Sequence, residues 1–269
     1  MCSTSSCPNP TCPSTNPSPS MKTNNTNPLD ESLQALRLPW MRENLDSLTT
    51  TAAKQKWTHS RFLAALLEGE LSQRQDRATA RRIAQARFPV IKTLEGFDWT
   101  WPKVNELEVR ELFQLRFVRD KANVILLGGC GLGKTHLATA LGHQACLSGH
   151  RVLFTSAAEL VNQLLAAQSE HRLKQELKKV LRPEVLVLDE LGYIPIDKHG
   201  ADLLFQVISQ RYERGSIILT SNKAYKEWPE IFNGDRTVTS AILDRLLHHV
   251  TTITIAGSSY RMGAKNQTA

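Results

Sequence analysis

The stretch Gly128-Gly129-Cys130-Gly131-Leu132-Gly133-Lys134-Thr135 decides the fold of this chain. It matches the phosphate-binding loop, in which a glycine, four variable residues and Gly-Lys-Thr surround phosphate oxygens with backbone amides. Glycines are needed because such a loop adopts positive φ angles and leaves no room for Cβ atoms. An apolar run precedes the loop and a helical pattern follows it, which is the strand, loop and helix context of a nucleotide-binding core.

We expect this loop to bind ATP together with Mg²⁺. Lys134 would reach the β- and γ-phosphates and Thr135 would hold the metal, while the N-terminus of the following helix adds partial positive charge. The residues expected to contact the nucleotide are Gly128, Gly129, Cys130, Gly131, Leu132, Gly133, Lys134, Thr135 and His136.

A second motif places two carboxylates at the end of another buried strand. The apolar run from Val185 to Leu188 is followed directly by Asp189 and Glu190. Adjacent residues at a strand end point in different directions, so the two acids can take different roles. We expect Asp189 to orient Mg²⁺ and Glu190 to polarise an attacking water, which predicts hydrolysis of ATP rather than transfer of phosphate to a bound acceptor.

A third strand, ending in Thr220, Ser221 and Asn222, carries polar groups to the same edge. The carboxyl edge of a parallel sheet is where such groups face a ligand crevice. Asn222 is therefore a candidate to hydrogen-bond the attacking water or a γ-phosphate oxygen. A simple strand-ending turn is the alternative reading of these residues.

Apolar β-branched runs alternate with helical stretches from Val104 onward, which predicts an α/β architecture. Five strands are expected, at 123–127, 151–155, 185–188, 216–221 and 251–255. Alternation of this kind is typical of a doubly wound parallel sheet with helices on both faces. The fold class predicted is therefore a P-loop nucleotide-binding domain with a five-stranded parallel sheet.

The chain before this domain has a different texture. Residues 1–28 are rich in Ser, Thr, Pro and Asn and predict a disordered tail, in which Cys2, Cys7 and Cys12 fit no familiar zinc spacing. Residues 29–95 show helical periodicity and predict a small all-helical N-terminal domain, followed by the ATPase domain at 96–262 and a flexible C-terminal tail at 263–269.

A run of arginines in the helical region is the candidate DNA-binding surface. Between Leu71 and Lys92 six basic residues stand against Asp76 alone, and the whole chain has a net charge of +7 and a pI near 9.3. Several of these arginines recur at helical spacing, so they share one face that favours the phosphate backbone of double-stranded DNA. The candidates are Arg74, Arg77, Arg81, Arg82 and Arg87. A solvated helix surface is the alternative.

Composition excludes some other classes of protein. The sequence contains no run of eighteen apolar residues, so we expect no membrane span, and it lacks the basic start and apolar run of a signal peptide. We therefore expect a cytoplasmic protein.

Two arginines late in the chain are candidates to act across a subunit boundary. Arg236 and Arg245 both lie near amphipathic stretches, and an arginine from a neighbouring subunit often neutralises the charge on a transferred phosphoryl group. An ion pair with Asp235 or Asp244 is the alternative role.

From about Leu33 to Arg261 the sequence resembles the IstB-like ATP-binding proteins, which assist the transposases of bacterial insertion sequences. Besides the phosphate-binding loop, the resemblance rests on several segments. They are Asp189-Glu190-Leu191-Gly192-Tyr193, Leu204-Phe205-Gln206 with Arg211-Tyr212-Glu213, Thr220-Ser221-Asn222, Glu227-Trp228, Leu243-Asp244-Arg245-Leu246 and Gly257-Ser258-Ser259-Tyr260-Arg261.

The resemblance implies an AAA+ fold related to helicase loaders of the DnaC type and to replication initiators. It gives Asn222 the sensor-1 role and Arg245 the role of the trans-acting arginine finger. It further implies that the helical N-terminal domain meets a transposase or another partner, and that ATP drives oligomerisation on DNA.

These expectations combine into one hypothesis. ATP assembles the protein into an oligomer on duplex DNA, the oligomer recruits or stimulates a transposase, and Mg²⁺-dependent hydrolysis to ADP and phosphate releases it. A replicative helicase loader is the alternative with the same core. A small-molecule kinase is disfavoured by Glu190 beside Asp189, as is a scaffold that binds ATP without turning it over.

Overall fold

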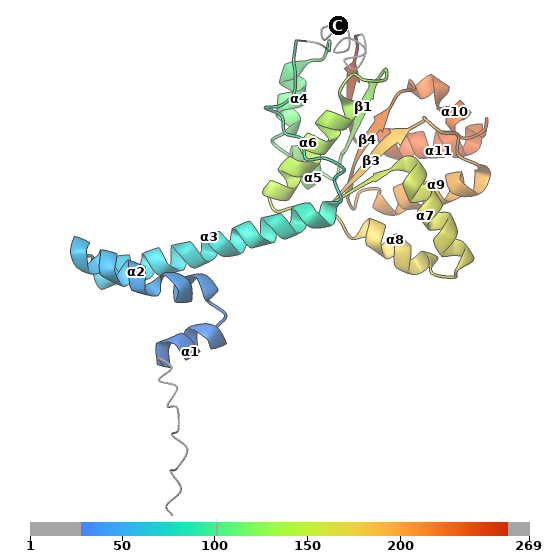
Figure 1. Ribbon diagram of the computed structural model, residues 1–269. Coiled ribbons are helices and arrows are strands. Elements are labelled where there is room, and N and C mark those ends of the chain that lie inside the picture. The colour runs from blue at the N-terminus through green and yellow to red at the C-terminus, as the bar shows by residue number, and fades with distance from the viewer. Residues whose placement is uncertain (1–27, 101, 258–269) are drawn as a thin grey trace, which may run out of the picture. The chain divides into compact units, whose positions relative to one another are not determined.

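The computed structural model describes residues 28–100 and 102–257 (Figure 1). By its packing the chain divides into two compact units, the first ending at Gln73 and the second beginning at Arg74. The division falls within one long helix. The expected N-terminal tail with its three cysteines, Trp101, and the C-terminal segment with Tyr260 and Arg261 lie outside the described residues.

Three helices build the first unit: α1 (Pro28–Ala35), α2 (Pro39–Gln55) and the beginning of α3 (His59–Ala86). Leu33, Met41 and Leu66 form its small buried core. Pro39 opens α2, where proline's fixed φ suits the first turn and its missing N–H is not needed.

A buried carboxylate fastens α2 to α3 within this unit. Glu70 accepts hydrogen bonds from the backbone N–H groups of Trp40 (3.0 Å) and Met41 (3.2 Å), which have no partner in the first turn of a helix. Gly69 lies under the Trp40 ring, where an added Cβ would come within 2.0 Å of it. Close packing of the two helices therefore depends on this glycine.

The second unit contains a five-stranded parallel sheet. Its strands are β1 (Asn123–Gly128), β2 (Val152–Ser156), β3 (Val185–Leu191), β4 (Ser216–Ser221) and β5 (Val250–Ile255). They lie in the order β2-β3-β4-β1-β5, and every neighbouring pair is parallel. The doubly wound parallel sheet predicted from the sequence is confirmed, and each strand lies where it was expected to within one residue at its start.

One strand is longer than predicted. β3 continues past Leu188 to Leu191 because its pairing with β4 resumes at Leu191 and Ser221 after an irregularity. Asp189 and Glu190 therefore belong to the end of the strand rather than to the loop after it.

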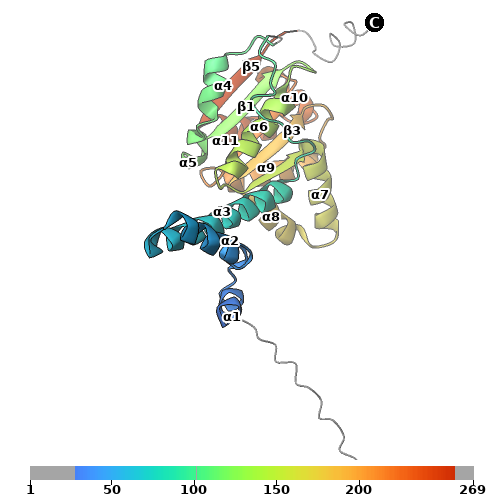
Figure 2. The same cartoon turned by 60° about the vertical axis from the view of Figure 1, so that its left-hand side comes forward.

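Helices cover both faces of the sheet (Figures 1 and 2). One face packs against α4 (Glu106–Leu112), α5 (Arg116–Arg119) and α6 (Lys134–Leu147). The other packs against α7 (Ala157–Ser169), α8 (Leu173–Leu181), α9 (Lys198–Arg211), α10 (Trp228–Ile231), which follows the short helix η1 (Tyr225–Glu227), and α11 (Arg236–Leu247). The central strands are buried on both faces, as expected for an α/β sheet.

A buried arginine ties the amino edge of this sheet together. The Arg211 guanidinium donates to the backbone carbonyls of Val180, Pro183, Glu184 and Ser216 at 2.9–3.1 Å. Burial lowers the pKa of Arg211 to about 10, so it stays charged at neutral pH. The end of α9 is thereby fixed to the starts of β3 and β4.

Within the described residues, no helix is both long and apolar enough to cross a membrane.

Candidate nucleotide-binding site

The glycine-rich loop joins β1 to α6 in a backbone conformation that favours glycine. Gly131 and Gly133 have φ angles of 76° and 87°. A Cβ at Gly133 would also come within 2.7 Å of the Phe97 ring. The loop is therefore built for backbone contact with a ligand, because a side chain at this position is excluded both by φ and by packing.

Lys134 is the first residue of α6, and its side chain turns back over the loop. It is buried, at 5% exposure, and its Nζ donates to the carbonyl oxygen of Gly129 at 2.7 Å. The ammonium group and the N-terminus of α6 thus lie together inside the loop, where both favour an anionic group.

Thr135 and Asp189 come together from elements far apart in the sequence. The Thr135 hydroxyl donates to Asp189 Oδ1 at 3.1 Å, and Asp189 is buried at 5% exposure. A hydroxyl and a carboxylate in contact at the mouth of a phosphate-binding loop are oxygen ligands of the kind that Mg²⁺ prefers, directly or through water. These two residues therefore fit a magnesium ion bound to phosphates.

The hydroxyl of Thr220 fixes the acidic pair. It is fully buried, donates to Asp189 Oδ1 and accepts from the backbone N–H of Glu190 at 2.9 Å. Glu190 itself has a left-handed φ of 59° and an exposed side chain. The two adjacent acids therefore face different surroundings, one buried against α6 and one open to solvent.

Asn222 follows β4 at the same edge of the sheet. Its Oδ1 is buried and has no hydrogen-bond partner among the residues that the structure describes. An unpaired buried amide oxygen is costly, by about 1–3 kcal/mol, unless a ligand or water donates to it. A bound water that donates to this oxygen would remove the cost.

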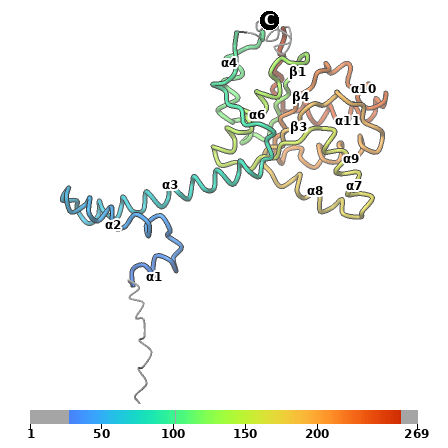
Figure 3. Tube along the Cα trace, in the orientation of Figure 1, coloured from blue at the N-terminus to red at the C-terminus, as the bar shows by residue number. Residues whose placement is uncertain are grey.

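A cavity of about 630 Å³ opens beside the loop, and sequence reasoning missed one of its walls. The connection from α3 to α4 runs beside α6 (Figures 1 and 3). Seven of its residues line the cavity opposite the loop: Pro89, Val90, Lys92, Gly96, Phe97, Asp98 and Pro102. His136 joins the two walls, because its Nε2 lies 2.9 Å from the carbonyl oxygen of Thr93 and its ring packs edge-on against Phe97.

Trp99 packs on the same wall. Its ring lies 4.9 Å from that of Phe97, and the Arg110 guanidinium lies 5.4 Å from its centroid. Trp99 is therefore a packing residue of this wall.

Glu190 lies between two cavities, because it also lines a second one of about 630 Å³ along β2. Tyr193 lines the first, and its pKa is raised by burial and by the neighbouring Cys130. The tyrosine is therefore a neutral hydroxyl at neutral pH, which can act as a hydrogen-bond donor at the mouth of the cavity.

Arg245 does not line the cavity beside the phosphate-binding loop. Arg245 lies in the last turn of α11, with its guanidinium 4.7 Å from the Phe205 ring and donating to the Ala241 carbonyl. It lines a small cavity with Asn123 and Ile217, which lie at the starts of β1 and β4, whereas the loop follows the end of β1. Arg245 is thus at the opposite edge of the sheet, while Arg236 is exposed at the start of α11.

Of the candidate DNA-binding arginines, four are exposed and one is committed to packing. Arg82 is half-buried, and it donates to the Cys146 carbonyl of α6 at 3.0 Å and to Thr79. The exposed ones are Arg74, Arg77, Arg81 and Arg87. Arg87 has a φ of 60° and lines the cavity along β2.

Residues 31–268 match the sequence model of the family described as IstB-like ATP binding protein. The chain is 45% identical over 240 residues to an ATP-binding protein of insertion sequence IS21 from Pseudomonas aeruginosa, covering 89% of this chain and 90% of the relative. It is 42% identical over 238 residues to the ATP-binding protein of IS5376 from Geobacillus stearothermophilus, covering 88% and 94%.

Solved structures show the same fold. AMPPCP-bound DnaA from Aquifex aeolicus superimposes with a TM-score of 0.51 at 21% identity, covering 68% of this chain and 56% of that one. DnaI superimposes with a TM-score of 0.51 at 21% identity, covering 61% and 91%. The expected AAA+ type of P-loop domain is confirmed.

The wall opposite the phosphate-binding loop is tested through His136. Replacing His136 with alanine removes its hydrogen bond to Thr93 and its ring contact with Phe97. We expect ATP to bind about tenfold more weakly, the equivalent of about 1.4 kcal/mol. Isothermal titration with ATP measures the change. His199→Ala, an exposed histidine on α9, is the control, and an unchanged affinity for His136→Ala would remove this wall from the site.

Proposed function

Because this chain belongs to the family of IstB-like ATP-binding proteins, we propose that it is a cytoplasmic, Mg²⁺-dependent ATPase that regulates transposition of an insertion sequence. It oligomerises on duplex DNA when ATP is bound, recruits or stimulates the transposase of its element, and is released when ATP is hydrolysed. The contact of Thr135 with Asp189 at the mouth of the phosphate-binding loop carries the proposal.

The hydrolytic step is assigned to residues that meet at the carboxyl edge of the sheet. Lys134 and the loop amides would hold the β- and γ-phosphates, and Thr135 and Asp189 would hold Mg²⁺, which when bound would neutralise phosphate charge. Glu190 accepts a proton from the attacking water, and the unpaired Oδ1 of Asn222 orients that water. Thr220 supports both acids through its single hydroxyl.

Arg245 acts in trans in this proposal. Its place at the amino edge of the sheet separates it from the cavity of its own subunit. An arginine placed in this way reaches a phosphate only on a neighbouring subunit. There it would stabilise charge in the transition state, and ATP turnover would depend on assembly.

The proposed partners of this chain are inferred from its family and from the positive charge of α3. Relatives named for insertion sequences, at 45% and 42% identity over most of the chain, favour a transposase over a replicative helicase as the partner. The exposed arginines of α3 supply a basic face for the DNA backbone.

A substitution at Glu190 tests the proposed role of this residue in ATP hydrolysis. The Glu190→Gln variant keeps the size of the side chain but not its ability to accept a proton. We expect the rate of phosphate release to fall about 100-fold or more while ATP affinity changes little. Asp202→Asn, an exposed acid on α9, is the matched control. Full turnover by Glu190→Gln would show that another group activates the water.

Mixing of two inactive variants tests the trans role of Arg245. Lys134→Ala subunits lose the nucleotide but supply an intact arginine, and Arg245→Ala subunits bind nucleotide without one. We expect each to hydrolyse ATP poorly alone and a mixture to regain activity. Arg236→Ala replaces Arg245→Ala in a parallel mixture to distinguish the two arginines. No gain on mixing would contradict a contribution of Arg245 across the subunit boundary.

Salt dependence tests the DNA surface. The combined variant Arg74→Ala, Arg77→Ala, Arg81→Ala removes three charges from α3. Because each lost phosphate contact lowers the slope of log K against log salt by about 0.9, we expect a flatter salt dependence, measured by fluorescence anisotropy on duplexes of unrelated sequence.

A second triple variant of equal charge controls for net charge: Arg116→Ala, Arg119→Ala, Arg214→Ala, all exposed arginines outside α3. If both triple variants change the slope equally, α3 is not the DNA-binding surface.

A further inference from the structure

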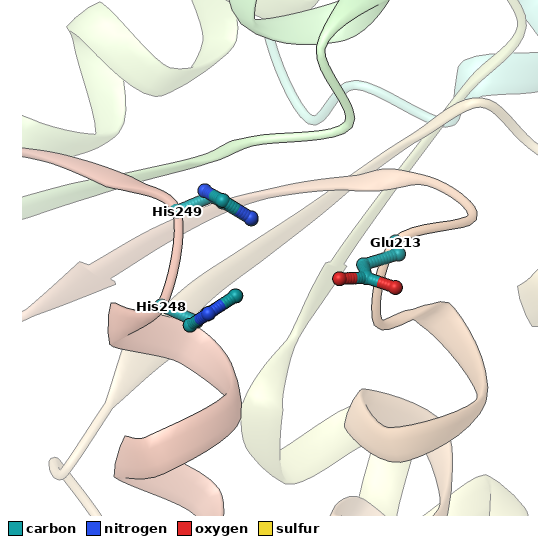
Figure 4. Close-up of side chains that lie close together, drawn as sticks. All are labelled: Glu213, His248 and His249. Carbon is teal, nitrogen blue, oxygen red and sulfur yellow. The ribbon is translucent and has the colours of Figure 1, made fainter.

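Two histidines and a glutamate meet at the amino edge of the sheet, away from the nucleotide cavity. Glu213 lies in the turn between α9 and β4, while His248 and His249 join α11 to β5. Figure 4 shows the two imidazole rings and the carboxylate directed toward a common space. Each residue offers one ligand atom, and these atoms all lie within 4.8 Å of one another.

The three side chains are free to rotate toward a shared metal ion. Metal–ligand bonds of about 2.1 Å to a single ion require the three ligand atoms to lie closer to one another than 4.8 Å. All three side chains are exposed, so small rotations about their χ angles bring the atoms together. Exposure also leaves room for a water molecule as a fourth ligand.

A neighbouring tyrosine prepares His248 as a ligand. The Tyr212 hydroxyl lies 2.8 Å from His248 Nδ1. In the tautomer that carries its proton on Nδ1, His248 donates the Nδ1–H to this hydroxyl. This leaves the Nε2 lone pair free, which is how ligating histidines are commonly oriented.

Rigid backbone holds the cluster from both sides. Glu213 adopts a left-handed φ of 57° in a turn closed by hydrogen bonds from the N–H groups of Arg214 and Gly215 to the Arg211 carbonyl. The His249 carbonyl accepts from the N–H of Asn123 at 2.7 Å, which fixes this histidine to the start of β1. Backbone positions are therefore set without a ligand.

We propose that Glu213, His248 and His249 bind a divalent transition-metal ion of the Zn²⁺ type. Two neutral imidazoles and one carboxylate form a donor set that zinc accepts with an open fourth position, and imidazole nitrogen suits zinc far better than magnesium. The site stands apart from the magnesium site at the carboxyl edge, so it does not rest on the proposed ATPase activity.

A metal ion bound at this cluster would also restrain α11. Arg245 and Lys121 line the same small cavity as Glu213 and His249, and His248 caps the helix that carries Arg245. The positive charges of Arg245 and Lys121 weaken cation binding, and the Glu213 carboxylate offsets part of this effect. An ion at the cluster fixes the last turn of α11.

Cobalt substitution tests the site directly. Tag-free, full-length protein is stripped of metal with a chelator, freed of nucleotide and titrated with Co²⁺, which reports its ligands through visible absorption. We expect one ion per chain with d–d bands and no thiolate charge-transfer band, and displacement by Zn²⁺. Ligand removal in His249→Ala or Glu213→Gln should weaken Zn²⁺ affinity at least tenfold.

Three further variants make the result specific. Tyr212→Phe keeps all three ligands but removes the partner of His248, so we expect affinity about 10-fold to 100-fold weaker, as for other outer partners of metal ligands. His199→Ala should leave affinity unchanged, and replacing Cys2, Cys7 and Cys12 with serine should also leave it unchanged.

Circular dichroism establishes that each variant is folded. Stoichiometric binding that survives in folded Glu213→Gln and His249→Ala, or that disappears with the three cysteines, would overturn the proposal. The absence of Co²⁺ binding at micromolar concentration would overturn it as well.

Discussion

A buried carboxylate at the end of the interior strand β3 is the constraint on which the candidate site depends. Asp189 lies at 5% exposure, where an unpaired charge is strongly unfavourable, so its oxygens need donors from neighbouring elements. Thr135 of α6 and Thr220 of β4 supply them. The requirement to satisfy one buried charge therefore sets the distance between the phosphate-binding loop, the acidic pair and the polar end of β4.

This arrangement links the fold to the chemistry. A parallel sheet brings the carboxyl ends of β1, β3 and β4 to one edge, so residues separated by tens of positions in the sequence become neighbours. The backbone of the loop is held open by glycine conformations and by Phe97 behind Gly133. Functional groups on rigid strands and at a helix N-terminus need little reorganisation to surround a triphosphate.

The sequence predicted most of the sheet and the groups at its carboxyl edge, because those signals are local. Short apolar runs located every strand, and the glycine loop and the Asp189-Glu190 pair carry their chemistry in adjacent residues. The wall from Pro89 to Pro102 was not predicted, since its role depends on His136 and Phe97 meeting across the cavity.

Other features also depend on contacts between distant segments. The sequence marks Arg211 only as part of a family motif, because its four carbonyl partners come from two separate stretches of chain, residues 180–184 and Ser216. The Glu213, His248 and His249 cluster has no sequence spacing that reveals it, because α9 and α11 must first pack together. Arg82 shares a helical face with its neighbours in sequence, yet tertiary packing directs it to Cys146.

The central claim is that Lys134, Thr135 and Asp189 surround the magnesium and phosphates of ATP. A crystal or electron-microscopy structure of the protein with Mg²⁺ and a non-hydrolysable ATP analogue tests it most directly. We predict that Lys134 Nζ leaves the Gly129 carbonyl for the β- and γ-phosphates and that the Thr135 hydroxyl binds the metal beside Asp189. A nucleotide bound elsewhere, with Lys134 still on Gly129, would contradict the claim.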